Sequence, residues 1–203
     1  MRVFTPRTLR FAVPALAIAV TLPALAWTSA FERLSLQPES RLWVDGTSTV
    51  RSFSCKATDI DAMVEGAPDA VAQVTAGEKG VSAVRVRVEV AKLECGNGTM
   101  NDHMRKALKT DANPVIDFKL ASYDVSRADE GVAGTLAGTL SLGGVQKSIS
   151  IPAVGKSEGG ALRVTGTYPL KMTDYGLKPP TLMFGRIKVG ETVTVKFDLL
   201  LKS

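Results

Sequence analysis

The stretch VRVRVEV, residues 84–90, decides the fold class of this chain. Valine stands at every second position, and a charged residue stands between each pair of valines. Because successive side chains of a β-strand point to opposite faces, this order gives one apolar face and one charged face. The stretch therefore predicts a half-buried strand with Val84, Val86, Val88 and Val90 pointing toward a core.

The same two-residue period recurs along most of the chain. Further apolar runs are Ile116/Phe118/Leu120, Leu136/Leu140/Leu142, Val145/Ile149/Ile151, Leu162/Val164/Tyr168/Leu170/Met172 and Val193/Val195/Phe197/Leu199. Turn-forming clusters such as Gly143-Gly144 separate these runs at hairpin spacing. Short strands with one apolar face must cover that face by curling into a barrel or by pairing with a second sheet. We expect an all-β fold, an eight-stranded antiparallel barrel with one short helix.

The expected helix follows the second cysteine. Met100, Met104, Ala107 and Leu108 have helical spacing and form one apolar stripe. Asn97 or Thr99 would cap its start, and Asn113-Pro114 ends it. A helix of about ten residues is marginal alone, so we expect the stripe to pack on a barrel end.

The first 26 residues have the composition of a secretory signal peptide. The segment combines a basic start at Arg2, Arg7 and Arg10, an apolar run over residues 11–25 and a small-x-small site at Ala24-Leu25-Ala26. The apolar run is shorter than the roughly 20 residues of a membrane-spanning helix. We expect cleavage after residue 26; a cut after Ala30 and an uncleaved anchor are the alternatives. Residues 27–39 are then a lead-in, and residues 40–203 form the barrel domain.

Charge and cysteine content narrow the function classes. The formal net charge is +5, and loss of the three leader arginines leaves about +2. No dense Lys/Arg stripe remains, so nucleic acid is not an expected partner.

Export to an oxidising compartment favours a disulfide between Cys55 and Cys95, with two buried free thiols as the alternative. One histidine and two separated cysteines make a poor zinc ligand set, and we expect no metal and no cofactor.

Four segments in order resemble the YceI-like family of lipocalin-like exported proteins. They are WVDGTSTVRSFSCKA (43–57), LECGNGTMNDHMRKALKTDANPVIDF (93–118), GTLSLGGVQKSISIP (138–152) and MTDYGLKPPTLMFGRIKVGETVTVKFDL (172–199). The resemblance implies a periplasmic protein with a lipocalin-like barrel that binds a polyisoprenoid or quinone. It also implies a membrane redox partner of the cytochrome b561 type. Many members carry one histidine shortly after the Asp of the early strand and another after its Phe. Here these neighbourhoods read Asp45-Gly46-Thr47-Ser48 and Phe53-Ser54-Cys55, so the chain resembles a cysteine-bearing branch.

The resemblance and the alternating pattern together nominate the residues that line the lumen. They are Val84, Val86, Val88, Val90, Phe118, Leu136, Leu140, Leu142, Val164, Phe184, Val195 and Phe197. The segment 171–185 is read as a connection across one barrel mouth, where Tyr175 or Lys178 would meet a polar head group. Periodicity identifies an inward face but leaves open whether that face surrounds a ligand or is filled by its own side chains.

Three functions compete at this point. The favoured one is a non-enzymatic binding or carrier protein for an isoprenoid-type lipid. The second is a solidly packed barrel that serves as an interaction module for a membrane redox partner. The third is an enzyme that uses the barrel as a reaction chamber, with His103, Asp102 or Lys106 as acid or base. The sequence contains no HExxH, phosphate loop, nucleophile elbow or CxxC.

Overall fold

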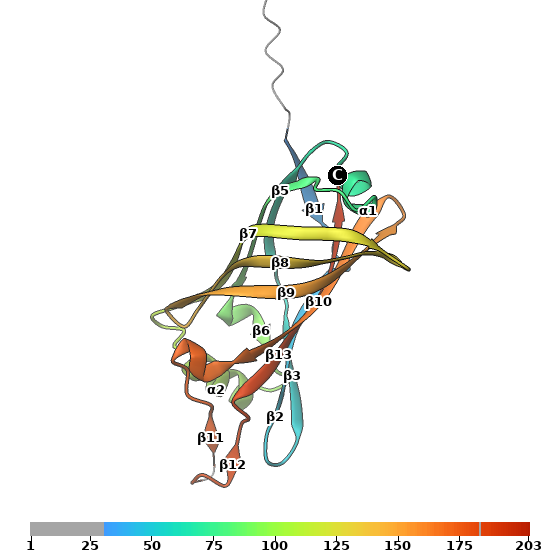
Figure 1. Cartoon of the computed structure of the whole chain (residues 1–203). Helices are drawn as coiled ribbons and strands as arrows, with labels where there is room; N and C mark the ends of the chain where they lie inside the picture. The colour runs from blue at the N-terminus through green and yellow to red at the C-terminus, as the bar shows by residue number, and fades with distance from the viewer. Residues whose placement is uncertain (1–30, 183) are drawn as a thin grey trace, which may run out of the picture.

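The computed structural model describes residues 31–182 and 184–203 (Figure 1). The predicted signal peptide lies outside these residues. The strands are β1 (Glu32–Leu36), β2 (Arg41–Thr47), β3 (Ser52–Ala57), β4 (Asp61–Gly66), β5 (Val81–Glu89), β6 (Leu93–Glu94), β7 (Val115–Ala128), β8 (Gly131–Leu142), β9 (Val145–Glu158), β10 (Ala161–Lys171), β11 (Thr181–Leu182), β12 (Ile187–Lys188) and β13 (Thr192–Lys202). The α-helices are α1 (Ala70–Thr75) and α2 (Gly98–Ala107), and 3₁₀ turns span Val90–Lys92 and Met172–Tyr175.

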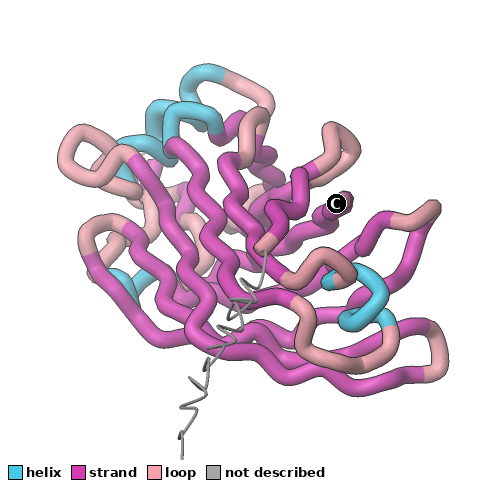
Figure 2. The backbone as a smooth tube through the Cα atoms, turned by 90° about the horizontal axis from the view of Figure 1, so that it is seen from above, coloured by secondary structure: helices cyan, strands magenta, loops and turns pink. Residues whose placement is uncertain are grey.

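Eight strands form a closed antiparallel ring in the order β1-β4-β5-β7-β8-β9-β10-β13, and β13 pairs back to β1. The view from above shows the strands curving around a common axis (Figure 2). The middle of β13 also pairs with β2, so β2, β3 and β6 extend the sheet beyond one end of the ring. Closure removes the unpaired edges that an open sheet would expose. The predicted eight-stranded barrel is confirmed.

Strand β1 closes the ring, and it lies in the segment that the sequence set apart as a lead-in. Leu34 pairs with Val64 on β4, while Leu36 pairs with Leu201 on β13. The barrel therefore begins before residue 40. Its short ERLSL run has one well-buried position, Leu34 at 2% exposure, so the apolar period was too brief to read as a strand.

Helix α1 forms in the connection between β4 and β5 and covers the upper end of the barrel (Figure 1). Ala70 is fully buried, and Val74 reaches the barrel interior. Gly80 allows this close approach, because a Cβ there would lie 2.7 Å from the Ala70 backbone. The sequence predicted no structure for this connection, since six residues are too short for a helical period to be recognised.

Strand β7 keeps its apolar residues inside although its sequence alternation breaks. Phe118 pairs with Leu140, and the register then shifts between Leu120 and Ser122. A bulge adds one residue to one strand, so the inward parity changes. Tyr123 therefore faces the interior, together with Phe118 and Leu120. The charged residues between the inward positions pair on the outer surface, as Arg85 does with Asp117 at 2.7 Å.

Candidate ligand-binding cavity

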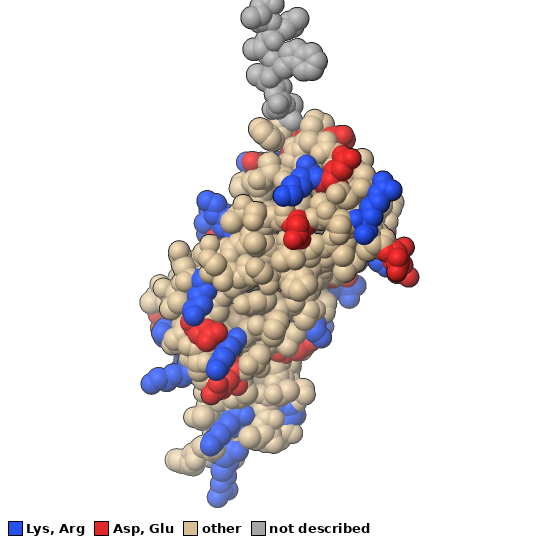
Figure 3. Space-filling model, viewed as in Figure 1, with Lys and Arg blue, Asp and Glu red and all other residues tan. Residues whose placement is uncertain are grey.

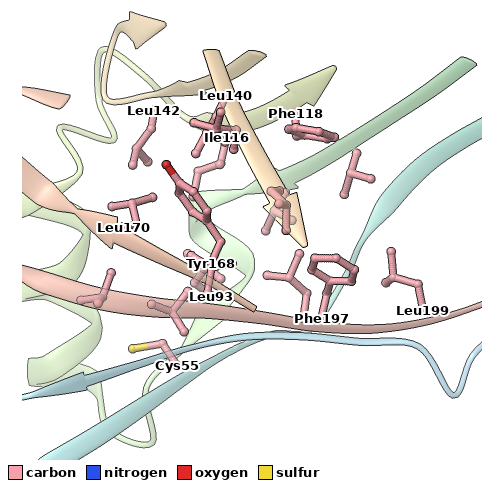
Figure 4. Close-up of a pocket in the computed structure, with 18 of the residues that line it drawn as sticks. Cys55, Leu93, Ile116, Phe118, Leu140, Leu142, Tyr168, Leu170, Phe197 and Leu199 are labelled. Atoms are coloured by element: carbon pink, nitrogen blue, oxygen red, sulfur yellow. The ribbon is translucent and has the colours of Figure 1, made fainter. Parts of the chain in front are cut away.

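The barrel encloses a cavity of about 710 Å³ that extends along its length. Apolar side chains from facing strands point toward one another across this space (Figure 4). Two packed clusters lie toward its ends, one around Leu34 and Val74 beside α1, the other around Leu170 and Tyr175. Between them, inward residues such as Val86 and Leu136 are only partly buried, although they lie inside a closed ring. The interior is therefore hollow in the middle rather than solidly packed.

The structure places ten of the twelve nominated lumen residues on the cavity wall. These ten are Val84, Val86, Val88, Phe118, Leu136, Leu140, Leu142, Val164, Val195 and Phe197. Their position follows from the two-residue period of their strands, which the sequence displays directly. That they contact a ligand stays a prediction.

The placement of Val90 in the lumen is corrected. Strand β5 ends at Glu89, and Val90 begins a 3₁₀ turn instead of continuing the strand. Its N–H donates to the Pro114 carbonyl at 2.8 Å, and its side chain is buried away from the cavity. The alternation in the sequence continues one step further than the extended backbone does.

The three residues nominated from segment 171–185 are also corrected. Phe184 lies at the turn between β11 and β12 with its side chain fully exposed. Lys178 is exposed and does not line the cavity. Tyr175 lies in a 3₁₀ turn with 2% exposure, packed behind the cavity wall. Met172, Leu177 and Pro180 of this segment line the cavity, and the chain then leaves the barrel as the β11–β12 hairpin (Figure 1).

Three phenylalanine rings of the lumen lie against glycines on neighbouring strands. Phe53 packs over Gly46, Phe118 over Gly138 and Phe197 over Gly166, and in each pair a Cβ on the glycine would overlap the ring. A ring that lies flat on a glycine covers the wall without reaching across the lumen. These pairs therefore help keep the cavity open. In the sequence, these pairs are indicated by a glycine at an inward position of a strand whose other inward residues are apolar.

Few polar groups line the cavity, and Tyr168 is one of them. Its hydroxyl points into the cavity (Figure 4). Behind it, the hydroxyl of Tyr175 has no hydrogen-bond partner within the described residues. The pKa of Tyr175 is raised to about 12, first by burial of the phenol and then by the nearby Tyr168 and Asp174. The Tyr175 phenol therefore remains a neutral donor at physiological pH.

Tyr123 supplies a polar group toward the α1 end of the cavity. Its hydroxyl accepts a hydrogen bond from the Val81 N–H at 3.0 Å, and the Lys79 ammonium lies 5.7 Å from the ring centre. The sequence reading missed Tyr123, because the bulge before it reverses the inward parity of β7.

Helix α2 lines the opposite end of the cavity, as its predicted apolar stripe required. Met100, Met104, Ala107 and Leu108 all reach the cavity wall. Asn97 is the N-cap, and its side chain accepts the Met100 N–H at 2.8 Å. The helix therefore packs on the barrel through the face that the sequence indicated.

Of the three acid–base candidates on this helix, only His103 lines the cavity. Asp102 is exposed and pairs with Arg105 at 3.2 Å, and Lys106 is exposed. Within residues 31–182 and 184–203, no group of three or more His, Cys, Asp or Glu side chains gathers at one point. His103 lines the cavity wall and belongs to no such group.

A disulfide joins Cys55 on β3 to Cys95 just before α2, as predicted. Next to it, the buried Asn101 side chain accepts the Cys95 N–H at 2.8 Å and donates to the Glu94 carboxylate at 2.6 Å. Both cysteines also line the cavity. The bridge therefore holds the start of α2 against the sheet extension at this end of the barrel.

The model of the YceI-like domain matches residues 43–201. The chain belongs to the YceI-like family. This family assignment confirms the resemblance seen in the sequence, and it spans strands β2 to β13 together with both helices. No curated protein matches the chain at a significant level.

Solved structures of three other proteins share the fold. BcnA of Burkholderia cenocepacia superposes with a TM-score of 0.64 at 14% identity, covering 82% of this chain and 99% of BcnA. A polyisoprenoid binding domain from Saccharophagus degradans, implicated in plant cell wall breakdown, gives 0.57 at 17% identity, covering 87% and 99%. The Campylobacter jejuni YCEI protein gives 0.57 at 16% identity, covering 72% and 82%. At these identities the likeness establishes the shared fold.

Proposed function

We propose that this YceI-like chain is a non-enzymatic binding or carrier protein for an isoprenoid-type lipid, a polyisoprenoid or a quinone. The observation that carries the proposal is the hollow, almost wholly apolar cavity along the barrel axis. The polyisoprenoid binding of the Saccharophagus degradans domain, which shares this fold, supports the same ligand class. A long cavity with few polar groups suits a linear chain of apolar isoprene units better than a compact polar substrate.

The energetics favour binding. Ligand pockets commonly measure about 300 to 1,000 Å³, and this cavity of about 710 Å³ lies within that range. Burial of roughly 400 Å² of apolar lipid surface, at about 25 cal/mol per Å², contributes on the order of 10 kcal/mol before association costs. The hydrophobic effect alone therefore supplies enough free energy to hold a water-insoluble chain.

The cellular setting is part of the proposal. The composition of residues 1–26, which predicts a signal peptide, supports export, and a periplasmic carrier would move or protect a lipid between membranes. A membrane redox protein of the cytochrome b561 type is the proposed partner if the ligand is a quinone. Among the described residues, no helix has the length and apolar character needed to cross a bilayer.

Native mass spectrometry tests the proposal most directly. Protein taken from a periplasmic extract should carry an added lipid mass, and the apo protein should take up an isoprenoid quinone in titration. Leu136→Trp places a large ring in the hollow middle of the lumen and should reduce uptake at least about ten-fold, because it occupies the volume of the tail.

The matched control is Ala137→Trp. Ala137 is the next residue on β8 and faces outward between Ser122 and Ser150, both exposed, so the added ring stays outside the barrel. Repeated apo spectra with no uptake by the native chain would refute the proposal. Equal loss in both variants would show that uptake does not depend on the lumen.

A further inference from the structure

Two hairpins form one end of the molecule, which we call the basic tip: residues 47–52 with residues 178–182 and 184–190. Figure 1 shows both hairpins at the end opposite α1. The Thr49 N–H donates to the Lys188 carbonyl at 3.0 Å, and the Thr49 hydroxyl donates to the Arg186 carbonyl at 3.2 Å. The Gly190 N–H donates to the Thr47 carbonyl at 2.8 Å. These bonds join the hairpins into a single unit.

The basic tip carries cations without compensating acids. Arg51, Lys178, Arg186 and Lys188 belong to it, and its residues include no Asp or Glu. All four side chains are exposed, and none forms an ion pair with any residue that the structure describes. Lys and Arg side chains occupy the lowest part of the face seen in Figure 3. On the barrel wall several cations are paired, as Arg163 is with Asp198 at 2.8 Å, whereas others such as Lys119 and Lys147 form no ion pair among the described residues.

Two large apolar side chains project from the same tip. Phe184 is fully exposed, and Val50 is 68% exposed. Phe184 also has a φ of 55°, in the left-handed region that residues with a Cβ rarely adopt. A strained backbone that exposes an aromatic ring to water does not stabilise the folded protein. The position of the Phe184 ring therefore points to contact with an apolar phase outside the protein.

The basic tip borders the cavity. Val50, Arg51, Pro180, Ile187 and Val189 all contribute to the cavity wall at this end. The exposed apolar groups and the cations therefore lie beside the cavity at the end of the barrel opposite α1. An aromatic ring among cations, with anionic groups absent, is the composition found where proteins contact anionic membrane interfaces.

We propose that the basic tip docks this protein on an anionic lipid bilayer. Phe184 and Val50 enter the interfacial region, while Arg51, Lys178, Arg186 and Lys188 face the headgroup phosphates. The biological role of docking rests on the proposed function, because docking would bring this end of the cavity close to the membrane that supplies the lipid. Docking itself requires no lipid in the lumen, so the two proposals can fail separately.

Vesicle co-sedimentation of the mature chain tests the docking. We expect binding to vesicles of equimolar phosphatidylcholine and phosphatidylglycerol at low ionic strength, and weak binding to phosphatidylcholine alone. Arg186→Glu with Lys188→Glu should weaken binding at least about 25-fold, since each cation near an anionic surface contributes about five-fold. The double variant Lys119→Glu with Lys202→Glu makes the same charge change on the outer barrel and at its opposite end, and should retain most of the binding.

Phe184→Ser tests the apolar contact and should weaken vesicle binding about ten-fold, as expected for losing part of a buried phenylalanine. Phe31→Ser is its control, because Phe31 is 68% exposed and immediately precedes β1. Absence of binding to anionic vesicles, or equal binding by the native chain and both tip variants, would overturn the proposal and assign the tip to an acidic protein partner.

Lipid uptake measured in parallel separates the two proposals. In detergent solution the tip variants should take up isoprenoid quinone as the native chain does, because their substitutions lie outside the lumen. Vesicle binding without any lipid in the lumen would support docking and reject the carrier function. Lipid uptake with no vesicle binding would reject docking and leave the carrier function standing.

Discussion

At the scale of single residues, the open lumen depends on glycines as much as on the apolar side chains. Gly166 lies opposite Phe197 on β13, and the ring occupies the space where a Cβ would stand. A methyl group there would also lie 2.9 Å from the Pro152 carbonyl oxygen, so the ring must move and the neighbouring strand must adjust. The free direction for the ring is the lumen.

We therefore expect Gly166→Ala to cost about 1–3 kcal/mol of unfolding free energy through overpacking, and to reduce the uptake of long-chain lipid. Denaturant unfolding and native mass spectrometry would measure the two effects. Gly98→Ala is the control, because nothing lies within 4 Å of a Cβ at that position. Unchanged stability and uptake in Gly166→Ala would argue against this role of the ring pairs.

A second residue-scale prediction concerns the buried Tyr175 hydroxyl. A buried hydroxyl without a partner is destabilising, so Tyr175→Phe should raise the unfolding free energy by about 1 kcal/mol near neutral pH. The pKa of Tyr175 is about 12 in the folded protein against an ordinary 10.0, so the folded state holds its proton more tightly than the unfolded chain. The raised pKa of Tyr175 therefore contributes stability that is fully present below pH 10, the ordinary pKa. This stability is lost as the pH rises toward about 12, the pKa in the folded protein.

Urea unfolding of both proteins across the alkaline range checks this linkage. The stability of the native chain should fall more steeply between these two pKa values than that of Tyr175→Phe. All other ionisable groups are the same in the two proteins, so the difference isolates Tyr175. Parallel alkaline profiles would contradict the assignment.

At the scale of elements, contacts with the rest of the protein stabilise α2, because a helix of ten residues is too short to be stable alone. The Asn97 cap, the bonds of Asn101 and the Cys55–Cys95 bridge all act on its first turn. A helix this short has little stability alone, so these contacts and the Met stripe determine its position.

Replacing both cysteines by serine should therefore lower the unfolding free energy by about 4 kcal/mol, the chain-entropy value for a separation of 40 residues. Denaturant unfolding of Cys55→Ser with Cys95→Ser measures the loss, and the native chain under reducing conditions should match the variant. A change smaller than about 1 kcal/mol would show that the bridge constrains little of the unfolded chain.

At the scale of the whole molecule, function follows from a ring that is packed near its ends and hollow between them. Strand β1 closes the ring against β4 and β13, which leaves the lumen walled on all sides. Packed clusters lie toward both ends, around Val74 beside α1 and around Leu170 and Tyr175 at the opposite end, and only the second end is bordered by the basic tip. The cations and exposed apolar groups of the tip therefore distinguish the two ends.

Several features of the fold and cavity were predictable from the chain, because they depend on local order. The alternation from Val84 to Val88 identified inward residues, and the Met100/Met104 stripe identified the packed face of α2. Predictions failed where the backbone left its local pattern: Val90 at the end of β5, and Phe184 in the β11–β12 hairpin, where its side chain is exposed. At Val90 the alternation of apolar and charged residues continues in the sequence, although the extended backbone of β5 has ended at Glu89.

The amino-acid sequence by itself determined the strand faces, the barrel class, the capped helix and the family. These follow from side-chain periodicity and spacing over a few neighbouring residues. Only the tertiary structure decided that the interior is hollow, that β1 closes the ring and that two distant hairpins combine into one basic tip. Volume and closure depend on how separate strands meet in space, and no local pattern records the distance between facing walls.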